Sequence, residues 1–421
     1  MFFEVNEKIE KLARRAQELC APEFKKVGEM AEYNQQKVLK AFIDNKVSDR
    51  NFAGSTGYGY GDDGREVLER VFAEIFAAED AIIRHNFVSG THALTVALFG
   101  VLRPGDTIIS VTGAPYDTLQ GVIGVARASS GSLKEFGINY EEVPLASDGS
   151  LDFSTIEKPI KCDTKMVYMQ RSRGYSMRGA LSIDNIGKVA HLAKKIAPNC
   201  IVMLDNCYGE FVGCEEPLQN GVDLIAGSLI KNPGGGLART GGYIAGRKDL
   251  VEQCSYRLTT PGTGKEVGAT LGLNRELFMG LFNAPHATGE ALKTAIFSAA
   301  LFELLGYEVF PRYNEPRSDI VQVIKLGNAE NLISFCQSIQ AASPVDSFVK
   351  PEPWDMPGYD NKIIMAAGTF TQGASIELSA DAPLREPYAV FLQGGLNFHS
   401  AKVAVMMAAD EVLKNRGTNA I

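Results

Sequence analysis

Short apolar segments alternate with amphipathic helical segments over residues 80–250, and this alternation constrains the fold more than any other feature of the chain. Strands buried on both faces are continuous apolar runs, and their alternation with helices is typical of a mainly parallel sheet. The sequence therefore predicts an α/β fold in which helices sandwich such a sheet. Ligands of these folds bind beyond the carboxyl ends of the strands. The expected strands lie at 81–83, 107–111, 165–169, 200–204, 222–226 and 242–245.

The chain has 421 residues, a length that suits two units with separate cores. Residues 1–50 are charged and carry a helical apolar stripe, so we expect an N-terminal helical arm. Residues 51–289 are expected to form the large domain, which includes a helix over 65–77 and ends in a stretch rich in Gly and Pro at 258–289. A helix over 290–305 and a strand-like run at 306–311 then begin a smaller C-terminal α/β domain, 290–421.

Composition narrows the possible partners. The net charge of −8 argues against nucleic acid or an anionic membrane and leaves a small molecule as the expected ligand. The seven cysteines are scattered without a CxxC pair, and no residues have metal-ligand spacing, so we expect free thiols and no metal site. The first residues lack the pattern of a secretory signal, and no apolar run approaches the roughly 20 residues of a membrane span. We therefore expect a cytoplasmic protein.

Two predicted strands end in residues of opposite charge. Asp205 closes the apolar run 201–204, and Lys231 follows the run 222–226 in the segment Gly-Ser-Leu-Ile-Lys-Asn. A desolvated lysine has a lowered pKa, and its free amine condenses with an aldehyde. A carboxylate can hold a pyridine nitrogen protonated. The pair therefore indicates the two poles of a pyridoxal phosphate site.

A helix start supplies the third part of this site. Ser89, Gly90 and Thr91 fall in the first turn of the helical pattern that continues to residue 102, where backbone amides and the helix dipole favour a phosphate. Tyr116 lies beyond the next expected strand, where its ring could stack on a cofactor.

Each of these features also has a structural interpretation. The Ser-Gly-Thr start is often an ordinary N-cap. Asp205 could cap the segment after it, Lys231 could be a solvated lysine, and Tyr116 a surface tyrosine in a turn. The order and spacing of all four together favour the cofactor site.

The same order resembles the pyridoxal-phosphate enzymes of the aspartate-aminotransferase fold, and within them the cystathionine lyase and methionine gamma-lyase group. The segments 205–210, 227–236 and 392–396 resemble more closely the subgroup named methionine gamma-lyase-like or aluminium-resistance proteins. This resemblance implies that Lys231 forms the Schiff base, that Asp205 pairs with the ring nitrogen and that Tyr116 stacks on the ring. It further implies that the amides of Gly90 and Thr91, together with Ser89 and Ser228, bind the phosphate.

In the lyase group a tyrosine of a neighbouring subunit reaches the phosphate from a loop that precedes the large domain. Tyr58 and Tyr60 lie in such a loop, within a Gly-rich segment. The resemblance therefore implies a homo-oligomer, at least a dimer and usually a tetramer. A Gly-Tyr loop that contacts no ligand is the alternative.

Three positions depart from the lyase pattern. Cys207 stands where the lyases carry a threonine that touches the cofactor. Arg173 or Ser172 stands in the segment that replaces the lyase loop beside the cofactor's phenolic oxygen, and one of them is expected to contact that oxygen. The arginine that binds the substrate carboxylate has no clear match, and Arg385 is the best candidate, since a bidentate carboxylate contact requires a guanidinium. These departures concern the substrate more than the cofactor.

The function that the resemblance implies is a carbon-sulfur lyase that acts on a sulfur-containing amino acid by beta or gamma elimination. The residues by themselves indicate only chemistry at an amino acid's alpha carbon. Aldol cleavage, transamination and side-chain replacement are alternative reactions on the same fold. A catalytically idle or nucleotide-binding scaffold is an alternative of another class.

Overall fold

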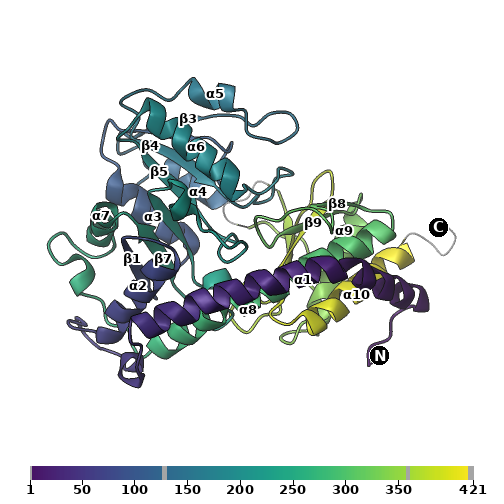
Figure 1. Cartoon of the computed structure of the whole chain (residues 1–421). Helices are drawn as coiled ribbons and strands as arrows, with labels where there is room; N and C mark the ends of the chain where they lie inside the picture. The colour runs from purple at the N-terminus through teal and green to yellow at the C-terminus, as the bar shows by residue number, and fades with distance from the viewer. Residues whose placement is uncertain (1, 126–129, 357–360, 416–421) are drawn as a thin grey trace.

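The computed structural model describes residues 2–125, 130–356 and 361–415, and its elements gather around two sheets (Figure 1). We name the part around the first sheet the large unit and the part around the second the small unit. The first sheet has seven strands in the order β1-β7-β6-β5-β4-β2-β3. These strands are β1 (Asp80–Arg84), β2 (Thr107–Ser110), β3 (Asn139–Glu142), β4 (Met166–Gln170), β5 (Ile201–Asp205), β6 (Leu224–Ser228) and β7 (Gly242–Gly246).

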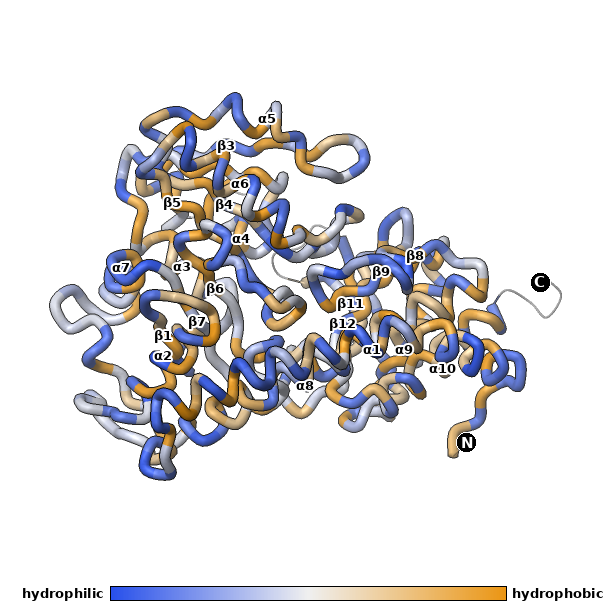
Figure 2. Tube along the Cα trace, in the orientation of Figure 1, coloured by the Kyte–Doolittle hydropathy of each residue, from blue (hydrophilic) through white to orange (hydrophobic). Residues whose placement is uncertain are grey.

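The seven-stranded sheet is mainly parallel, as predicted. Strands β2 to β6 run parallel to their neighbours, and only the β1–β7 and β6–β7 pairings are antiparallel. Apolar side chains of α3 (Gly90–Val101), α4 (Asp117–Ile123) and α7 (Lys248–Leu258) form the core on one face. Those of α2 (Asp63–Ile75) and α6 (Ile183–Ile196) form the core on the other. The central strands β4 and β5 are buried along their whole length and belong to the hydrophobic parts of the trace (Figure 2).

The small unit has a five-stranded sheet in the order β10-β11-β12-β9-β8, with every pairing antiparallel. Its helices α9 (Ala329–Ala341) and α10 (Phe398–Asn415) cover one face, and their apolar residues belong to a single core with those of the sheet. The short helix α5 (Phe153–Glu157) belongs to the large unit and not to the small one. The small unit's strands are β8 (Glu308–Phe310), β9 (Gln322–Lys325), β10 (Ile363–Ala366), β11 (Ser379–Pro383) and β12 (Ala389–Gln393).

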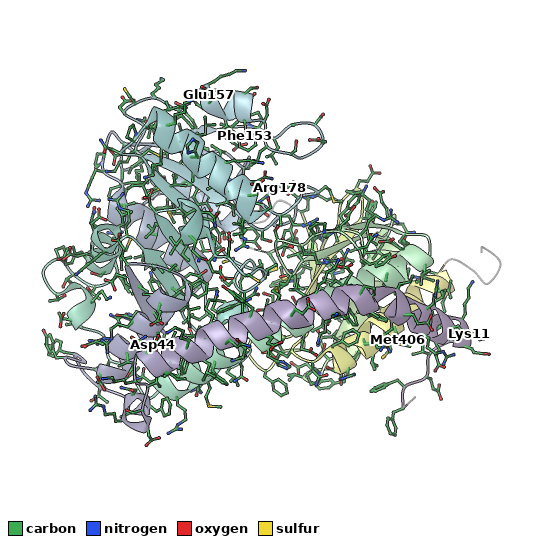
Figure 3. All side chains as sticks on the ribbon, in the orientation of Figure 1. Lys11, Asp44, Phe153, Glu157, Arg178 and Met406 are labelled. Atoms are coloured by element: carbon green, nitrogen blue, oxygen red, sulfur yellow. The ribbon has the colours of Figure 1, made fainter. Side chains whose placement is uncertain are left out.

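Two long helices connect the units. The helix α1 (Glu7–Asp44) packs along α8 (Asn274–Leu304), and Figure 3 labels Lys11 at the small-unit end of α1 and Asp44 at the large-unit end. The predicted start of a helix at residue 290 is wrong, because α8 begins at Asn274 and includes Pro285. The expected boundary at 289/290 thus lies inside a continuous helix. Of the helices in the described ranges, none combines the length and the apolarity that a membrane span requires.

Candidate active site

A cavity of about 240 Å³ opens at the carboxyl ends of β5 and β6, beside the first turn of α3. This is the edge of the sheet where a ligand was expected. Three segments distant in the sequence meet there because neighbouring parallel strands end at the same edge. The predicted site residues that line the cavity are Ser89, Gly90, Thr91, Tyr116, Asp205, Cys207, Ser228 and Lys231, and Ser172 lies in the same wall.

The start of α3 forms one wall of the cavity. Ser89 is the N-cap residue, and its Oγ accepts a hydrogen bond from the N–H of His92 (3.1 Å). The amides of the first turn precede the first intrahelical donor and are therefore open to a ligand. A Cβ on Gly90 would lie 3.1 Å from the Cβ of Ser228 and 3.6 Å from the Sγ of Cys207. Glycine at this position thus lets a ligand approach the helix backbone closely.

Asp205 is the last residue of β5 and is buried. Its Oδ1 accepts a hydrogen bond from the N–H of Cys207 (3.0 Å), which fixes the carboxylate in the cavity wall. Burial raises the pKa of Asp205, while the charge of Lys231 acts in the opposite direction. Burial likewise raises the pKa of the Cys207 thiol, which lies in the same wall.

Lys231 follows β6 and faces the same cavity. Its Nζ lies 3.9 Å from the centre of the Tyr208 ring. The expectation of a lowered lysine pKa is wrong. Burial by itself lowers the pKa of Lys231, but the acidic groups around it, led by Cys207 and Tyr208, outweigh burial and raise that pKa above its usual value.

Tyr116 enters the cavity from the start of α4. Its backbone N–H donates to the Oε1 of Gln170 (2.7 Å), and the Nε2 of Gln170 donates to the carbonyl of Ser172 (3.0 Å). Gly174 has a positive φ of +57°, and a Cβ there would lie 3.3 Å from the Tyr116 ring. The segment after β4 therefore holds the ring in position. Sequence reasoning missed Gln170, although its place at the end of a predicted strand was a usable signal.

Arg173 and Arg385 line a neighbouring cavity of about 350 Å³ that shares Tyr116 with the first. Arg173 is buried, and its Nε lies 3.9 Å from the carboxylate of Asp319. Ser172 donates from its Oγ to the same carboxylate (2.9 Å). Arg385 is exposed at the mouth of this neighbouring cavity.

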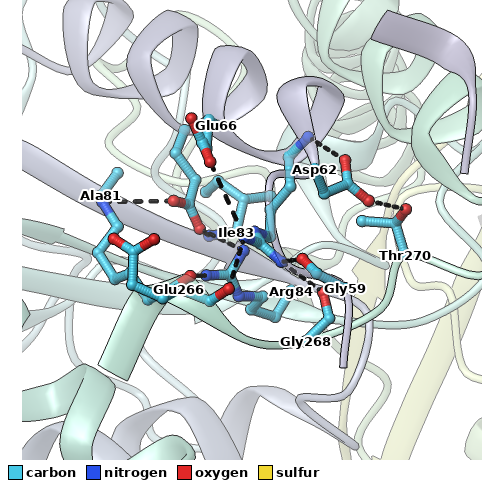
Figure 4. Close-up of polar contacts among 12 residues, drawn as sticks. Gly59, Asp62, Glu66, Ala81, Ile83, Arg84, Glu266, Gly268 and Thr270 are labelled. Atoms are coloured by element: carbon cyan, nitrogen blue, oxygen red, sulfur yellow. Dashed lines mark hydrogen bonds and ion pairs between the residues drawn. The ribbon is translucent and has the colours of Figure 1, made fainter. Parts of the chain in front are cut away.

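Tyr58 and Tyr60 do not line the cavity of their own chain, and they are 77% and 65% exposed. Their loop is nevertheless fixed. The buried guanidinium of Arg65 donates from Nη1 to the carbonyls of Gly59 (2.7 Å) and Gly268 (2.7 Å), as Figure 4 shows. The loop thus presents both tyrosines outward on a rigid base.

Comparisons with known proteins agree with this architecture. The family model described as methionine gamma-lyase matches residues 9–413. The chain is 46% identical to an uncharacterized protein, YnbB, of Bacillus subtilis over 411 residues, which cover 97% of this chain and 98% of the relative. The crystal structure of a carbon-sulfur lyase involved in aluminum resistance from Clostridium novyi is 51% identical, with a TM-score of 0.93 and coverage of 97% of this chain and 96% of that one.

A more distant relative has a described enzymatic name. The L-methionine gamma-lyase of Treponema denticola is 26% identical over 266 residues, which cover 63% of this chain and 61% of the relative. The similarity to the Clostridium novyi structure extends over both units. The match to the family model begins within α1 and ends within α10. The chain therefore belongs to the methionine gamma-lyase family.

Proposed function

We propose that the protein is a pyridoxal-phosphate-dependent carbon-sulfur lyase that eliminates a thiol from the beta or gamma position of a sulfur-containing amino acid. One observation carries the proposal: Lys231, Asp205 and the first turn of α3 line a single cavity. An amine, a buried carboxylate and a set of helix amides are the three groups that the aldehyde, the ring nitrogen and the phosphate of this cofactor require.

The residues of the cavity fit the cofactor. Around the first turn of α3, where the phosphate is expected, the cavity wall offers backbone amides and the hydroxyls of Ser89, Thr91 and Ser228. The carboxylate of Asp205 would pair with the ring nitrogen, and the ring of Tyr116 would stack on the cofactor. When bound, pyridoxal phosphate supplies an electron sink for a carbanion at the substrate's alpha carbon.

The chain's own residues then have separate tasks. Lys231 would bind the cofactor's aldehyde, and its free amine would act as general base and proton carrier at the substrate's alpha carbon. Asp205 would keep the ring nitrogen protonated, and Cys207 lines the cavity wall beside these groups. Arg385 binds the substrate carboxylate from the neighbouring cavity. Arg173 or Ser172 would contact the phenolic oxygen of the cofactor.

We further propose that the site is completed by a second copy of the chain. Tyr58 and Tyr60 are exposed and face away from the cavity of their own chain, while Arg65 fixes their loop. Both facts suit a loop that reaches the phosphate of a neighbouring subunit in a dimer or tetramer.

The first test is spectroscopic. The protein purified with pyridoxal phosphate should be yellow, and Lys231→Ala should lose the visible band of the lysine-bound cofactor, because no other amine faces the cavity within the described residues. Lys188→Ala, on the exposed side of α6, is the matched control and should keep the band. A wild-type protein that cannot be made to bind the cofactor would overturn the proposal.

The second test identifies the reaction. Sulfur-containing amino acids are offered to the loaded protein, and keto acid, ammonia and thiol are measured together. Release of all three in equal amounts supports elimination. Transfer of the amino group to an added keto acid, without release of a thiol, would assign the protein to a different reaction of the same cofactor.

A further inference from the structure

One side chain beside the Lys231 amine, that of Tyr208, has no role in the proposed mechanism. The Nζ of Lys231 lies over the face of the Tyr208 ring, 3.9 Å from its centre. Within the described residues, no hydrogen bond and no ion pair within 4 Å is formed by this nitrogen. An aromatic face attracts an ammonium group through its quadrupole, most strongly where water is excluded. Tyr208 is therefore in position to hold the lysine when it is charged.

The backbone of Tyr208 is held in an uncommon conformation. Its φ is +70°, which non-glycine residues rarely adopt. The turn is closed by a hydrogen bond from the N–H of Gly209 to the carbonyl of Asn206 (3.0 Å). The buried side chain of Arg171 packs 2.3 Å from the place of a Cβ on Gly209, and its Nη1 donates to the Oδ1 of Asn206 (2.8 Å). Such strain persists only where the surroundings fix it, and it often marks a functional site.

The other end of the side chain is tied to the small unit. The hydroxyl of Tyr208 accepts a hydrogen bond from the Oγ of Ser375 (3.0 Å). Ser375 lies between β10 and β11, so this bond joins the turn after β5 to the second sheet. The tyrosine is thus fixed at its backbone by the large unit and at its hydroxyl by the small unit.

We infer that Tyr208 is a positioning residue for Lys231, in which the ring stabilises the ammonium group and the hydroxyl sets the ring's place relative to the small unit. In the proposed reaction this stabilises Lys231 in the step after it has taken the proton from the alpha carbon. Only that last role rests on the proposed function. The contact between Tyr208 and Lys231 is present in the chain without its cofactor, so it can be tested in cofactor-free protein.

Other ionisable groups also face Lys231. Asp205 and Cys207 approach it from the end of β5 and the turn after it, Glu210 lies in the segment after that turn, and Asp381 lies across the cavity on β11. They contribute to the affinity of Lys231 for its proton in every variant considered below. A comparison of variants that differ only at Tyr208 therefore isolates the contribution of its side chain to the pKa of Lys231.

The experiment measures the pKa of Lys231 in cofactor-free protein. Trace acetylation with acetic anhydride is followed over the alkaline pH range, and the peptide that contains Lys231 is quantified by mass spectrometry. Tyr208→Leu should lower the titration midpoint by about one pH unit, because the ring no longer stabilises the charged form. Tyr208→Phe retains the ring but loses the hydrogen bond to Ser375, and Ser375→Ala removes the same bond from the other side. Both variants should lower the midpoint by less than Tyr208→Leu does.

Lys194 on α6, which is paired with Asp223 (2.6 Å), is the internal control. The extent of its acetylation should not differ between the variants if they are folded. A wild-type midpoint for Lys231 in Tyr208→Leu, or a decrease in Tyr208→Phe as large as in Tyr208→Leu, would overturn the inference. Should the leucine variant not fold, the phenylalanine and Ser375 variants still decide it, since an unchanged midpoint in both contradicts the positioning role.

Discussion

At the scale of single residues, Glu210 is a buried acid whose ionisation is disfavoured by its burial. Its side chain is fully buried, and its Oε1 accepts a hydrogen bond from the hydroxyl of Tyr243 (2.6 Å). Its Oε2 has no hydrogen-bond partner among the described residues. Burial raises the pKa of Glu210 to about 8, and the Tyr243 hydrogen bond and the charge of Lys231 only partly oppose this. The carboxyl group is therefore largely protonated at neutral pH.

This raised pKa predicts a change of stability with pH. A carboxyl group whose pKa is higher in the folded state favours folding fully below its ordinary value of 4.5, and this contribution is lost as the pH rises to about 8. Glu210→Gln keeps the shape without the ionisation. Its free energy of unfolding, measured with urea, should match the wild type near pH 4.5 and exceed it by a few kcal/mol above about pH 8.

The control for this prediction is Glu157→Gln, at the exposed outer edge of the large unit (Figure 3). The difference in unfolding free energy between this variant and the wild type should not change over the same pH range. A constant difference for Glu210→Gln would mean that the pKa of its carboxyl group is the same in the folded and unfolded states, which contradicts the prediction.

At the scale of elements, the first turn of α3 should tolerate no side chain at Gly90. Its φ is negative, so Gly90→Ala adds a methyl group without backbone strain, but that group would lie 3.1 Å from Ser228. The crowding should weaken binding of pyridoxal phosphate about tenfold to a hundredfold, as measured by absorbance titration. Gly28→Ala on α1 has no atom within 4 Å of the new methyl group and should bind as the wild type does.

The helix α1 is attached to the segment after Asp205 through one buried amide. The Nδ2 of Asn34 donates to the carbonyls of Phe211 (3.3 Å) and Gly213 (2.9 Å). Asn34→Ala leaves these acceptors without a partner and should lower the free energy of unfolding by about 1–3 kcal/mol. Gln36→Ala, on the exposed face of the same helix, should change it by less than about 0.5 kcal/mol. Equal effects in urea unfolding would contradict a specific role for Asn34.

The sequence predicts some elements well and others poorly, for physical reasons. Strands buried on both faces, such as β5, are continuous apolar runs, and the structure has them within two residues of the expected bounds. The edge strand β3 (Asn139–Glu142) was missed because three of its four residues are exposed and none needed to be apolar. The start of α8 was missed because Pro285 and several glycines signal a loop locally, whereas packing against α1 and the apolar core of the large unit stabilises a helix there.

At the scale of the whole molecule, the cavity is lined by residues of the large unit, but one of them, Tyr208, is bonded to the small unit, and this limits what sequence can predict about the site. Asp205 and Lys231 were predictable because each follows an apolar run. Tyr208 was not, since its positive φ and its bond to Ser375 arise from packing between segments far apart in the chain. The raised pKa of Lys231 has the same origin, because it depends on groups that converge only in the fold.

The proposed oligomer makes a prediction that only mixed subunits can test. Tyr58→Phe/Tyr60→Phe and Lys231→Ala should each lose most lyase activity as pure proteins. In a mixed dimer, the site that keeps Lys231 on one chain receives intact tyrosines from the other and should work. Equal co-expression should therefore restore about one quarter of the wild-type sites, as measured by the rate of thiol release. Activity no higher than that of the two pure variants would mean that each chain completes its own site.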